Sequence, residues 1–492
     1  MRCVQLALVA ATAAAAGAPL GGCGHPAAGG DAAPATDAGA ALDAGTAPGA
    51  LEWDPRLPPT SRLATYRGLR PARGIIHLHT IHSHDACDGA PVLADGTPNE
   101  PCNQDLRRGL CLTREDYALY TDHPTLLGTT SFEDALLIRA GDEPVTDPAT
   151  GAHVANVIVC EDGHRVFTMV GMEDELMPVA FSAHPDVPVG PALEDFYNQY
   201  DADTALAEAE AGALVLVAHS EGRTLDYLLG LPLVGFEIYN LHANVDPDIR
   251  VDSLGQTDPF GAITAIATFA QSHDVPDLAW LAFFFENRPS LELFDQVLAE
   301  RPAVGTLGTD AHQNSVPFLF SDGERGDSYR RMMRWFSNVL LVPEGAALAP
   351  DVVRGALAGG RVYGAFEIYG TPDGFDYHAE DAGGATSEMG DHVSLTAAPV
   401  LHVTAPHVLD LDPRAAPPPV TIELVWASAA GPVVVAESGP DEDLAYTPTD
   451  PGAYRVVVYV TPTHLSPFLG ADAGDWIARF PWIYANPIYV EP

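Results

Sequence analysis

Short apolar runs alternate with amphipathic stretches along most of the chain. Apolar runs of this length, bounded by Gly or Pro, predict buried strands. They cover residues 74–79, 117–121, 154–160, 166–172, 214–219, 234–240, 278–286 and 303–310, and helical patterns cover 203–211, 261–272 and 290–301. This alternation predicts a mainly parallel sheet with outer helices. Because the short segment 161–164 joins the run 154–160 to the next, we expect it to be a hairpin partner in an insertion.

The pattern changes in the C-terminal quarter of the chain. Residues 390–492 have no helical period and many prolines, and the β-rich runs lie at 392–397, 420–427, 432–438 and 454–460. Short strands separated by turn residues predict a small all-β, immunoglobulin-like sandwich. We therefore divide the folded chain into an α/β domain over residues 53–372 and a sandwich over 373–492.

The N-terminus predicts an export signal. Arg2 precedes an apolar stretch at residues 4–16, and the small residues Gly21 and Gly22 lead to Cys23. This order resembles a bacterial lipobox, which implies removal of the signal and a lipid on Cys23; an ordinary signal peptide cut nearby is the alternative. Residues 24–52, rich in Ala, Gly and Pro, predict a flexible tether. We expect an exported protein, lipid-anchored to the bacterial membrane or cell surface.

Charge narrows the choice of partner. The chain carries 67 acidic and 24 basic residues, a formal net charge of −43. Binding of DNA or RNA requires clustered Lys and Arg, so this balance argues against a nucleic acid partner and favours a small substrate.

Cysteine usage agrees with export. Beyond Cys3 and Cys23, four cysteines remain: Cys87, Cys102, Cys111 and Cys160. An even number in an oxidising compartment predicts two disulfides, with three pairings open. A bridge in the loop from Cys87 to Cys111 would pin that loop, and plain stabilisation of the loop is an equal alternative.

Histidines and carboxylates gather where the predicted strands end. They follow five apolar runs: His77, His79, His82, His84 and Asp85; Asp122 and His123; Glu173; His219; and Asp310 and His312. The carboxyl ends of parallel strands in an α/β barrel meet at one face, where active sites are built. The pattern therefore predicts a polynuclear metal site.

These motifs resemble the PHP (polymerase and histidinol phosphatase) family of metal-dependent phosphoesterases. The resemblance covers roughly residues 70–370 and rests on H-x-H-T (77–80), T-D-H (121–123), G-x-E (171–173) and G-T-D-A-H (308–312). It implies a distorted seven-stranded β/α barrel holding two or three metal ions. A histidine eleven residues after Glu173 matches His184, and an Asp-Ala pair eight residues after His77 matches Asp85.

The resemblance also implies a division of the ligands. One ion would be held by His77, His79, Glu173 and Asp310, a second by Glu173 as a bridge with His184 and His219, and a third by Asp85, His123 and His312. His84 competes with Asp85 for the last position. Mixed imidazole and carboxylate ligands suit Zn, Mn or Fe.

The implied activity is hydrolysis of a small phosphomonoester or phosphodiester by metal-activated water at a di- or trinuclear centre. Arg223 and Arg288 are candidates for gripping phosphate, Asp122 for orienting the site, and Glu237 and Asn240 for lining it. Two alternatives stay open. One is a metal-dependent hydrolase of a non-phosphate ester or amide. The other is a surface binding protein whose sandwich recognises a glycan or protein, with an accessory barrel.

Overall fold

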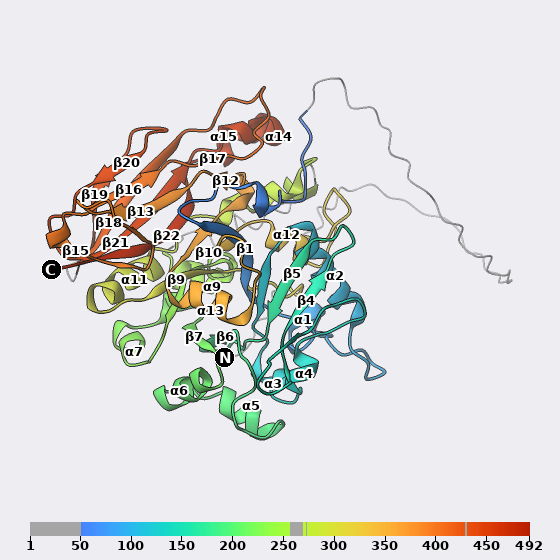
Figure 1. Cartoon of the computed structure of the whole chain (residues 1–492). Coiled ribbons are helices and arrows are strands. Elements are labelled where there is room, and N and C mark those ends of the chain that lie inside the picture. The colour runs from blue at the N-terminus through green and yellow to red at the C-terminus, as the bar shows by residue number, and fades with distance from the viewer. Residues whose placement is uncertain (1–50, 256–268, 272, 429–430) are drawn as a thin grey trace, which may run out of the picture. The chain divides into compact units, whose positions relative to one another are not determined.

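The computed structural model describes residues 51–255, 269–271, 273–428 and 431–492 (Figure 1). Residues 53–492 form one compact unit. The predicted export signal, Cys23, almost all of the tether and most of the predicted helix 261–272 lie outside the described residues. Within them, no helix is both long enough and apolar enough to cross a membrane.

The first half of the compact unit is a mixed α/β arrangement. Its strands are β1 (Leu69–Leu78), β2 (Tyr117–Tyr120), β3 (Val145–Thr146), β4 (His153–Val159), β5 (Arg165–Met169), β6 (Leu176–Val179), β7 (Leu214–Val217), β8 (Gly235–Asn240) and β9 (Val304–Gly308). β1, β2 and β5 are parallel neighbours, and β8 is parallel to β9. β4 pairs antiparallel with β5, which confirms the predicted hairpin. β6 pairs antiparallel with β7.

Backbone contacts connect these separate pairings. Phe181 N donates to Val170 O, and Val234 N donates to Val215 O. A parallel bridge joins Leu78 to Ala311, just beyond β9. The carboxyl ends of β1, β2, β5, β7, β8 and β9 therefore lie at one end of the strand set, as expected from the sequence.

Helices and short turns connect the strands. The longer helices are α2 (Glu100–Leu112), α5 (Pro191–Tyr197), α6 (Ala202–Glu210), α11 (Arg288–Glu300) and α13 (Pro350–Ala358). Short elements are η1 (Thr60–Arg62), α1 (Ala86–Gly89), α3 (Pro124–Leu127), α4 (Phe132–Ala135), η2 (Ser220–Gly222), α7 (Leu225–Leu229), α8 (Leu241–Val245), α9 (Pro247–Asp252), α12 (Tyr329–Met333) and η4 (Glu367–Tyr369). The predicted strand 278–286 is wrong: η3 (Pro276–Phe283), a 3-10 helix, occupies most of this apolar run. Apolarity without a period does not distinguish a strand from a buried helical turn.

The C-terminal region continues the sheet of the first half. Its strands are β10 (Ser337–Pro343), β11 (Val362–Ala365), β12 (Pro372–Asp373), β13 (Asp376–Glu380), β14 (Thr386–Glu388), β15 (His392–Ser394), β16 (Val400–Thr404), β17 (His407–Val408), β18 (Val420–Ser428), β19 (Gly431–Glu437), β20 (Leu444–Tyr446), β21 (Gly452–Val460) and β22 (Phe480–Glu491). Short helices are η5 (Leu395–Ala397), η6 (Thr463–Leu465), α14 (Ser466–Leu469), η7 (Gly470–Asp472) and α15 (Ala473–Trp476). One mixed sheet runs in the order β19-β18-β21-β22-β11-β10-β1-β2-β5-β4-β3, and β13, β14, β16 and β20 form another.

The predicted boundary at residue 372 falls inside this shared architecture. β22, at the end of the chain, pairs with β11 from before the boundary. The Asn486 side chain accepts from Gly305 N at 2.7 Å and donates to Gly305 O at 3.0 Å. Buried Arg455 makes a two-pronged ion pair with Asp295 at 2.6 and 2.7 Å. The two regions therefore share hydrogen bonds and buried charge, and the division at 372 stays a prediction.

Two disulfides join the four remaining cysteines. Cys87 pairs with Cys102 and Cys111 with Cys160, one of the three pairings that the sequence left open. Disulfides are typical of proteins in oxidising compartments, which is compatible with an extracellular location.

Candidate metal centre

Eight histidines and carboxylates converge at the carboxyl ends of the strands. We call this set the histidine centre: His77, His79, Asp85, His123, Glu173, His219, Asp310 and His312. Ligand atoms within 4.8 Å of one another occur in four overlapping groups: His79, Asp85, His123 and His312; His77, His79 and Asp310; His77, Glu173 and His219; and His219, His242 and Asp310. Overlap of this kind is the arrangement expected where several cations share bridging ligands.

Most of these imidazoles are oriented through Nδ1. His77 Nδ1 donates to Glu237 Oε1 at 2.6 Å. His312 Nδ1 donates to the Asp310 carbonyl at 2.8 Å. His79 Nδ1 lies 3.1 Å from Ser83 Oγ, whose own hydrogen goes to Asp85, so Nδ1 is the donor there too. A hydrogen bond of this kind fixes the tautomer and leaves Nε2 as an acceptor directed into the centre.

The Nε2 atoms directed into the centre face carboxylate oxygens. Nε2 of His77 and of His79 lies 3.2 and 3.3 Å from Asp310 Oδ1. Nε2 of His77, His79 and His312 and Oε2 of Glu173 are buried and make no hydrogen bond among the described residues. A buried acceptor without a donor costs free energy, about 1–3 kcal/mol each. Divalent cations coordinated by imidazole nitrogen and carboxylate oxygen satisfy all of them, so the residues present fit such ions.

Two carboxylates connect the groups. Asp310 Oδ2 lies 3.7 Å from His219 Nε2, and its Oδ1 serves His77 and His79. Glu173 Oε2 lies 2.9 Å from His123 Nδ1, and Oε1 lies 3.5 Å from His219 Nε2. Each is therefore placed to serve more than one cation.

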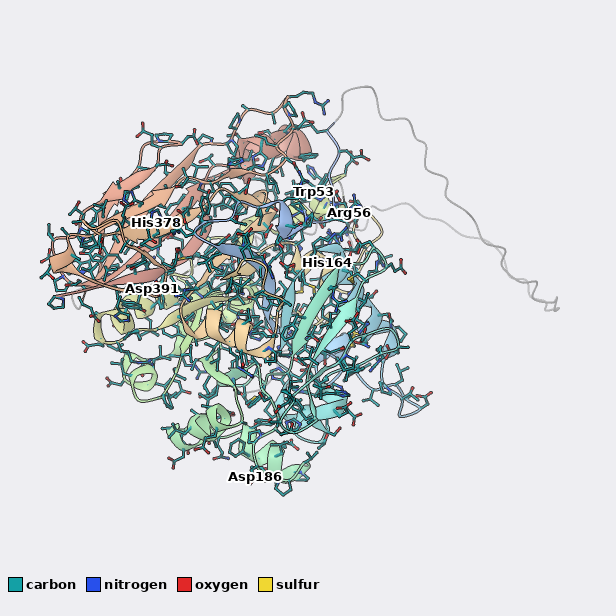
Figure 2. The ribbon with its side chains drawn as sticks, viewed as in Figure 1. Trp53, Arg56, His164, Asp186, His378 and Asp391 are labelled. Carbon is teal, nitrogen blue, oxygen red and sulfur yellow. A yellow bond between two sulfur atoms is a disulfide. The ribbon has the colours of Figure 1, made fainter. Side chains whose placement is uncertain are left out.

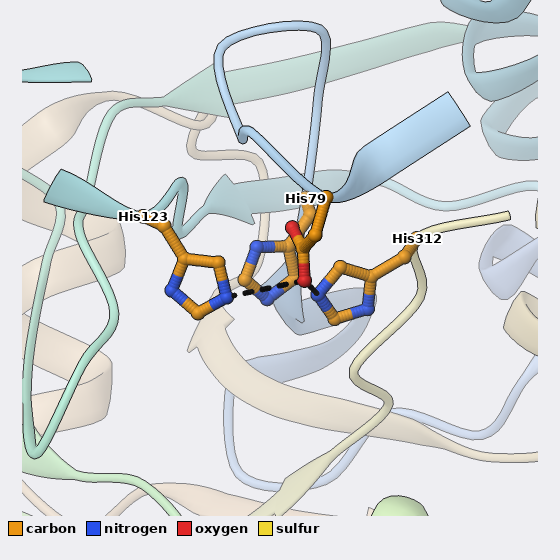
Figure 3. Close-up of side chains that lie close together, drawn as sticks. His79, His123 and His312 are labelled. Carbon is orange, nitrogen blue, oxygen red and sulfur yellow. Dashed lines mark ion pairs between the residues drawn. The ribbon is translucent and has the colours of Figure 1, made fainter. Parts of the chain in front are cut away.

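Asp85 closes the outer group. Asp85 Oδ2 lies 3.5 Å from His123 Nε2 and 3.3 Å from His312 Nε2, and dashed lines mark ion pairs among these side chains in Figure 3. The figure shows the rings of His79, His123 and His312 turned toward one another. His84, the competing candidate, is exposed, and its ring stands 5.1 Å from that of His123. The geometry favours Asp85 for this position.

The backbone is strained where the ligands are presented. His77, His219 and Asp310 have φ angles of 70°, 50° and 53°. Left-handed backbone is uncommon for residues other than Gly and clusters at functional sites. Gly308 is also needed for the geometry of the centre, since a Cβ there would lie 2.0 Å from Glu237 Oε1. Only Gly leaves room for the carboxylate that orients His77.

The electrostatics of the centre attract positive charge. Burial works to lower the pKa of His77, yet Glu237 and Asp310 raise it well above its ordinary value. Burial and the neighbouring His312 lower the pKa of His79 to about 3, which keeps that ring neutral. His79 is thus in the neutral state that a metal ligand requires, and a cation bound at His77 would displace the additional proton that Glu237 and Asp310 stabilise there.

His184 is the one predicted ligand that the structure does not bring to the histidine centre. Its Nδ1 lies 2.8 Å from Tyr197 Oη and its Nε2 lies 3.0 Å from Thr130 O. The reason is strand direction. β6 runs antiparallel to β7, with Val179 opposite Leu214, so the chain after β6 emerges beside the start of β7, whereas His219 follows its end.

The other predicted functional residues lie in different settings. Asp122 is buried and accepts from Thr80 N at 2.6 Å and Thr80 Oγ1 at 2.8 Å, which fixes the turn after His79. Burial raises the pKa of Asp122 to about 7, against the effect of these hydrogen bonds. Arg223 pairs with Glu175 at 3.0 Å, two residues after Glu173. Arg288 is 79% exposed and pairs with Glu286 at 3.6 Å rather than with a residue of the histidine centre.

Sequence reasoning left the orienting residues unassigned. Glu237 is more than a lining residue: besides His77, it accepts from His219 N at 3.0 Å and Asn240 Nδ2 at 2.7 Å. Ser83, which joins His79 to Asp85, carried no sequence signal beyond its place in the first motif. His242 lies two residues after β8, and its place at a strand end is the signal that marks it in the sequence.

Comparisons with known proteins add little to this geometry. No family model matches the chain, and no curated protein matches it. Among solved structures it is similar to a two-domain protein from Bacteroides vulgatus ATCC 8482 described as containing a predicted PHP-like metal-dependent phosphoesterase. The two are 10% identical, the match covers 88% of this chain and 99% of the other, and the TM-score is 0.33. At that TM-score the likeness carries no argument about fold or function.

Proposed function

We propose that the chain is a metal-dependent phosphoesterase of the PHP type, which hydrolyses a small phosphomonoester or phosphodiester. One observation carries the proposal: imidazole nitrogens and carboxylate oxygens from five separate segments lie within 4.8 Å of one another in overlapping groups, and four of these buried atoms make no hydrogen bond among the described residues. In this proposal β1, β2, β5, β6, β7, β8 and β9 are the strands of a distorted seven-stranded barrel, and the C-terminal sheets are its immunoglobulin-like sandwich.

The residues divide the work of such a site. The histidine centre would hold two or three divalent ions, whose charge acidifies water and balances negative charge on phosphoryl oxygens. Glu237 and Ser83 orient the rings of His77 and His79, and Asp122 fixes the turn at Thr80 that follows them. Orienting partners of this kind typically contribute 10–100-fold to metal affinity or activity.

The position of Arg223 supports a role in binding substrate. Its partner Glu175 stands two residues beyond Glu173, and the Arg223 side chain is 17% exposed. A guanidinium there is suited to two-pronged contact with a phosphate that displaces Glu175. Arg288 offers less support because it lies at the start of α11, paired with Glu286.

The location is also proposed. A lipid on Cys23 would tether the compact unit to the outside of the cell, and Cys23→Ser would then move the protein from the membrane fraction to the soluble fraction. A glycan or protein partner for the sandwich stays a proposal with no contact to support it.

The decisive experiment is a substrate panel on protein reloaded separately with Zn, Mn and Fe(II). p-Nitrophenyl phosphate and bis(p-nitrophenyl) phosphate should be hydrolysed, and chelation or Glu173→Gln should abolish turnover. Esterase and amidase substrates run in parallel. Turnover of those alone would favour the non-phosphate hydrolase, and fewer than two ions per chain in the reloaded protein would contradict the polynuclear centre.

A further inference from the structure

His242 reaches the histidine centre from a segment that supplies no predicted ligand. Its Nδ1 lies 3.2 Å from Asp310 Oδ2, and its ring centroid lies 5.4 Å from that of His219. His242, His219 and Asp310 form one of the four groups whose ligand atoms fall within 4.8 Å of one another. The side chain is 47% exposed, which places it at the rim rather than in the buried interior.

The backbone of His242 is tied to the network that orients the deeper ligands. Asn240 Oδ1 accepts from His242 N at 2.7 Å, and Asn240 Nδ2 donates to Glu237 Oε2 at 2.7 Å. Glu237 in turn holds His77 Nδ1 and the backbone N of His219. One pair of side chains, Glu237 and Asn240, therefore sets the positions of three histidines.

A carboxylate stands behind His242 on the side away from the centre. Asp246 Oδ2 lies 3.7 Å from His242 Nε2, one helical turn further along the chain. Asp246 Oδ1 is already engaged, since it accepts from Asp248 N at 2.9 Å and Ile249 N at 3.1 Å at the start of α9. The cap holds Asp246 in place and leaves Oδ2 for the ring. A carboxylate behind a histidine is the partner that metal-ligating imidazoles commonly have.

The set assigned by motif spacing is one histidine short in this fold. His184 points to Tyr197 and Thr130, so the histidine that spacing assigned beside His219 is not at the centre. His242, on α8, lies beside His219 instead.

We propose that His242 is a metal ligand of the histidine centre, binding through Nδ1 next to His219 and Asp310, with Asp246 as its positioning residue. The proposal rests on the proposed metal-dependent function and adds to it a ligand from the helix after β8. Because the ring is at the rim, the ion it holds is the one most open to solvent and to substrate.

The test is metal counting on four purified, reloaded full-length proteins: wild type, His242→Ala, Asp246→Asn and His184→Ala. After gel filtration, His242→Ala should retain one ion fewer than wild type, or bind its weakest ion at least ten-fold less tightly in a chelator competition. Asp246→Asn should weaken the same ion about 10–100-fold, as expected for an orienting partner. His184→Ala is the matched control and should keep the wild-type count.

The outcomes separate the two proposals. Fewer than two ions in wild type would overturn the proposed function itself. At least two ions in wild type, with an unchanged count and affinity in His242→Ala, would overturn the role of His242 alone. The same holds if His242→Ala raises the KM for a phosphoester while its ions stay bound, since His242 would then contact substrate. Loss of an ion in His184→Ala instead would return the ligand role to His184.

Discussion

Two networks of buried charge in this molecule are built in opposite ways. The histidine centre gathers imidazole nitrogens and carboxylate oxygens, four of which are buried without a hydrogen bond among the described residues. The arginine cluster, made of Asp277, Arg330 and Arg331 with Glu324 and Asp322 at its edge, gathers donors around acceptors. Arg330 donates to both oxygens of Asp277 at 2.8 and 2.9 Å, and Arg331 also binds Asp277. Trp53, labelled in Figure 2, adds a donor at 2.9 Å.

The difference separates a structural network from a ligand site. In the arginine cluster both carboxylate oxygens of Asp277 have donors, and the arginines hold the pKa of Asp277 below its ordinary value despite burial. In the histidine centre, by contrast, Nε2 of His77, His79 and His312 and Oε2 of Glu173 are buried and make no hydrogen bond among the described residues. Burial is similar in the two, with Asp277 and Asp310 2% and 9% exposed. Completeness of pairing, rather than burial or charge, distinguishes them.

The largest effect is expected from Glu173→Gln. This carboxylate contacts His123 and His219 from different groups, so the change should remove more than one ion per chain and reduce hydrolysis to background. Metal analysis of the reloaded variant, with phosphatase activity beside it, checks this. The unfolding midpoint of the chelated variant should match that of chelated wild type. Retention of every ion would mean that Glu173 is not a bridge.

Asp277→Asn should have the opposite effect: it should reduce stability and leave the metal count unchanged. Removing the charge leaves Arg330 and Arg331 buried without their main partner, which costs about 3–5 kcal/mol of stability. Chemical denaturation should report that loss while the folded fraction keeps its metal count. A variant as stable as wild type would contradict the structural role given to the cluster, and loss of ions from folded protein would remove the contrast between the two networks.

The two disulfides allow the same comparison between a bridge beside the histidine centre and a bridge that only stabilises the fold. Cys87 N donates to His312 O at 2.9 Å and Asp88 N to Gln313 O at 2.8 Å, so the Cys87–Cys102 bridge closes on the segment that carries a ligand. Replacing both of its cysteines by Ser should weaken the ion near Asp85 and His312. The same change at Cys111 and Cys160 should cost stability alone, about 2–5 kcal/mol. Chelator competition and denaturation on both variants measure the difference; equal metal affinities would contradict it.

The sequence predicted which side chains meet at one place better than it predicted the framework around them. Residues directly after apolar runs, such as His219 and Asp310, lie where expected because strand ends are a local property of the chain. His184 was placed by spacing alone, and spacing does not reveal that β6 runs against β7. The role of Glu237 depends on contacts with His77, 160 residues earlier in the chain, which no local pattern records.

The C-terminal region illustrates the same limit. Its β-rich character was readable from the alternating runs, and β18, β19 and β21 lie where those runs predicted strands. The pairing of β22 with β11 was not readable, because register between distant strands is set by packing. Since Asn486 and Arg455 bind residues of the first half, we expect a chain ending at residue 372 to lose its fold rather than only its sandwich.

Glu208 is a buried carboxyl that belongs to neither the arginine cluster nor the histidine centre, and it therefore provides a third case. Both its oxygens are buried without a hydrogen bond among the described residues, yet it belongs to none of the four groups of ligand atoms. Burial raises its pKa from 4.5 to about 8, so the folded protein keeps it protonated and neutral. The unfolded chain releases this proton near pH 4.5, and the contribution of Glu208 to stability therefore falls as the pH rises toward 8.

Glu208→Gln should remove that dependence, because the amide has a similar shape and no charge. Between about pH 5 and pH 8 the free energy of unfolding of wild type should fall relative to the variant by about 1 kcal/mol per pH unit, and the difference should level off above pH 8. Denaturation of both proteins in excess chelator, at pH 5 to 9, isolates this term from metal binding. Parallel curves would mean that Glu208 is ionised in the folded state and binds a cation. Glu208 would then have to be counted among the metal ligands.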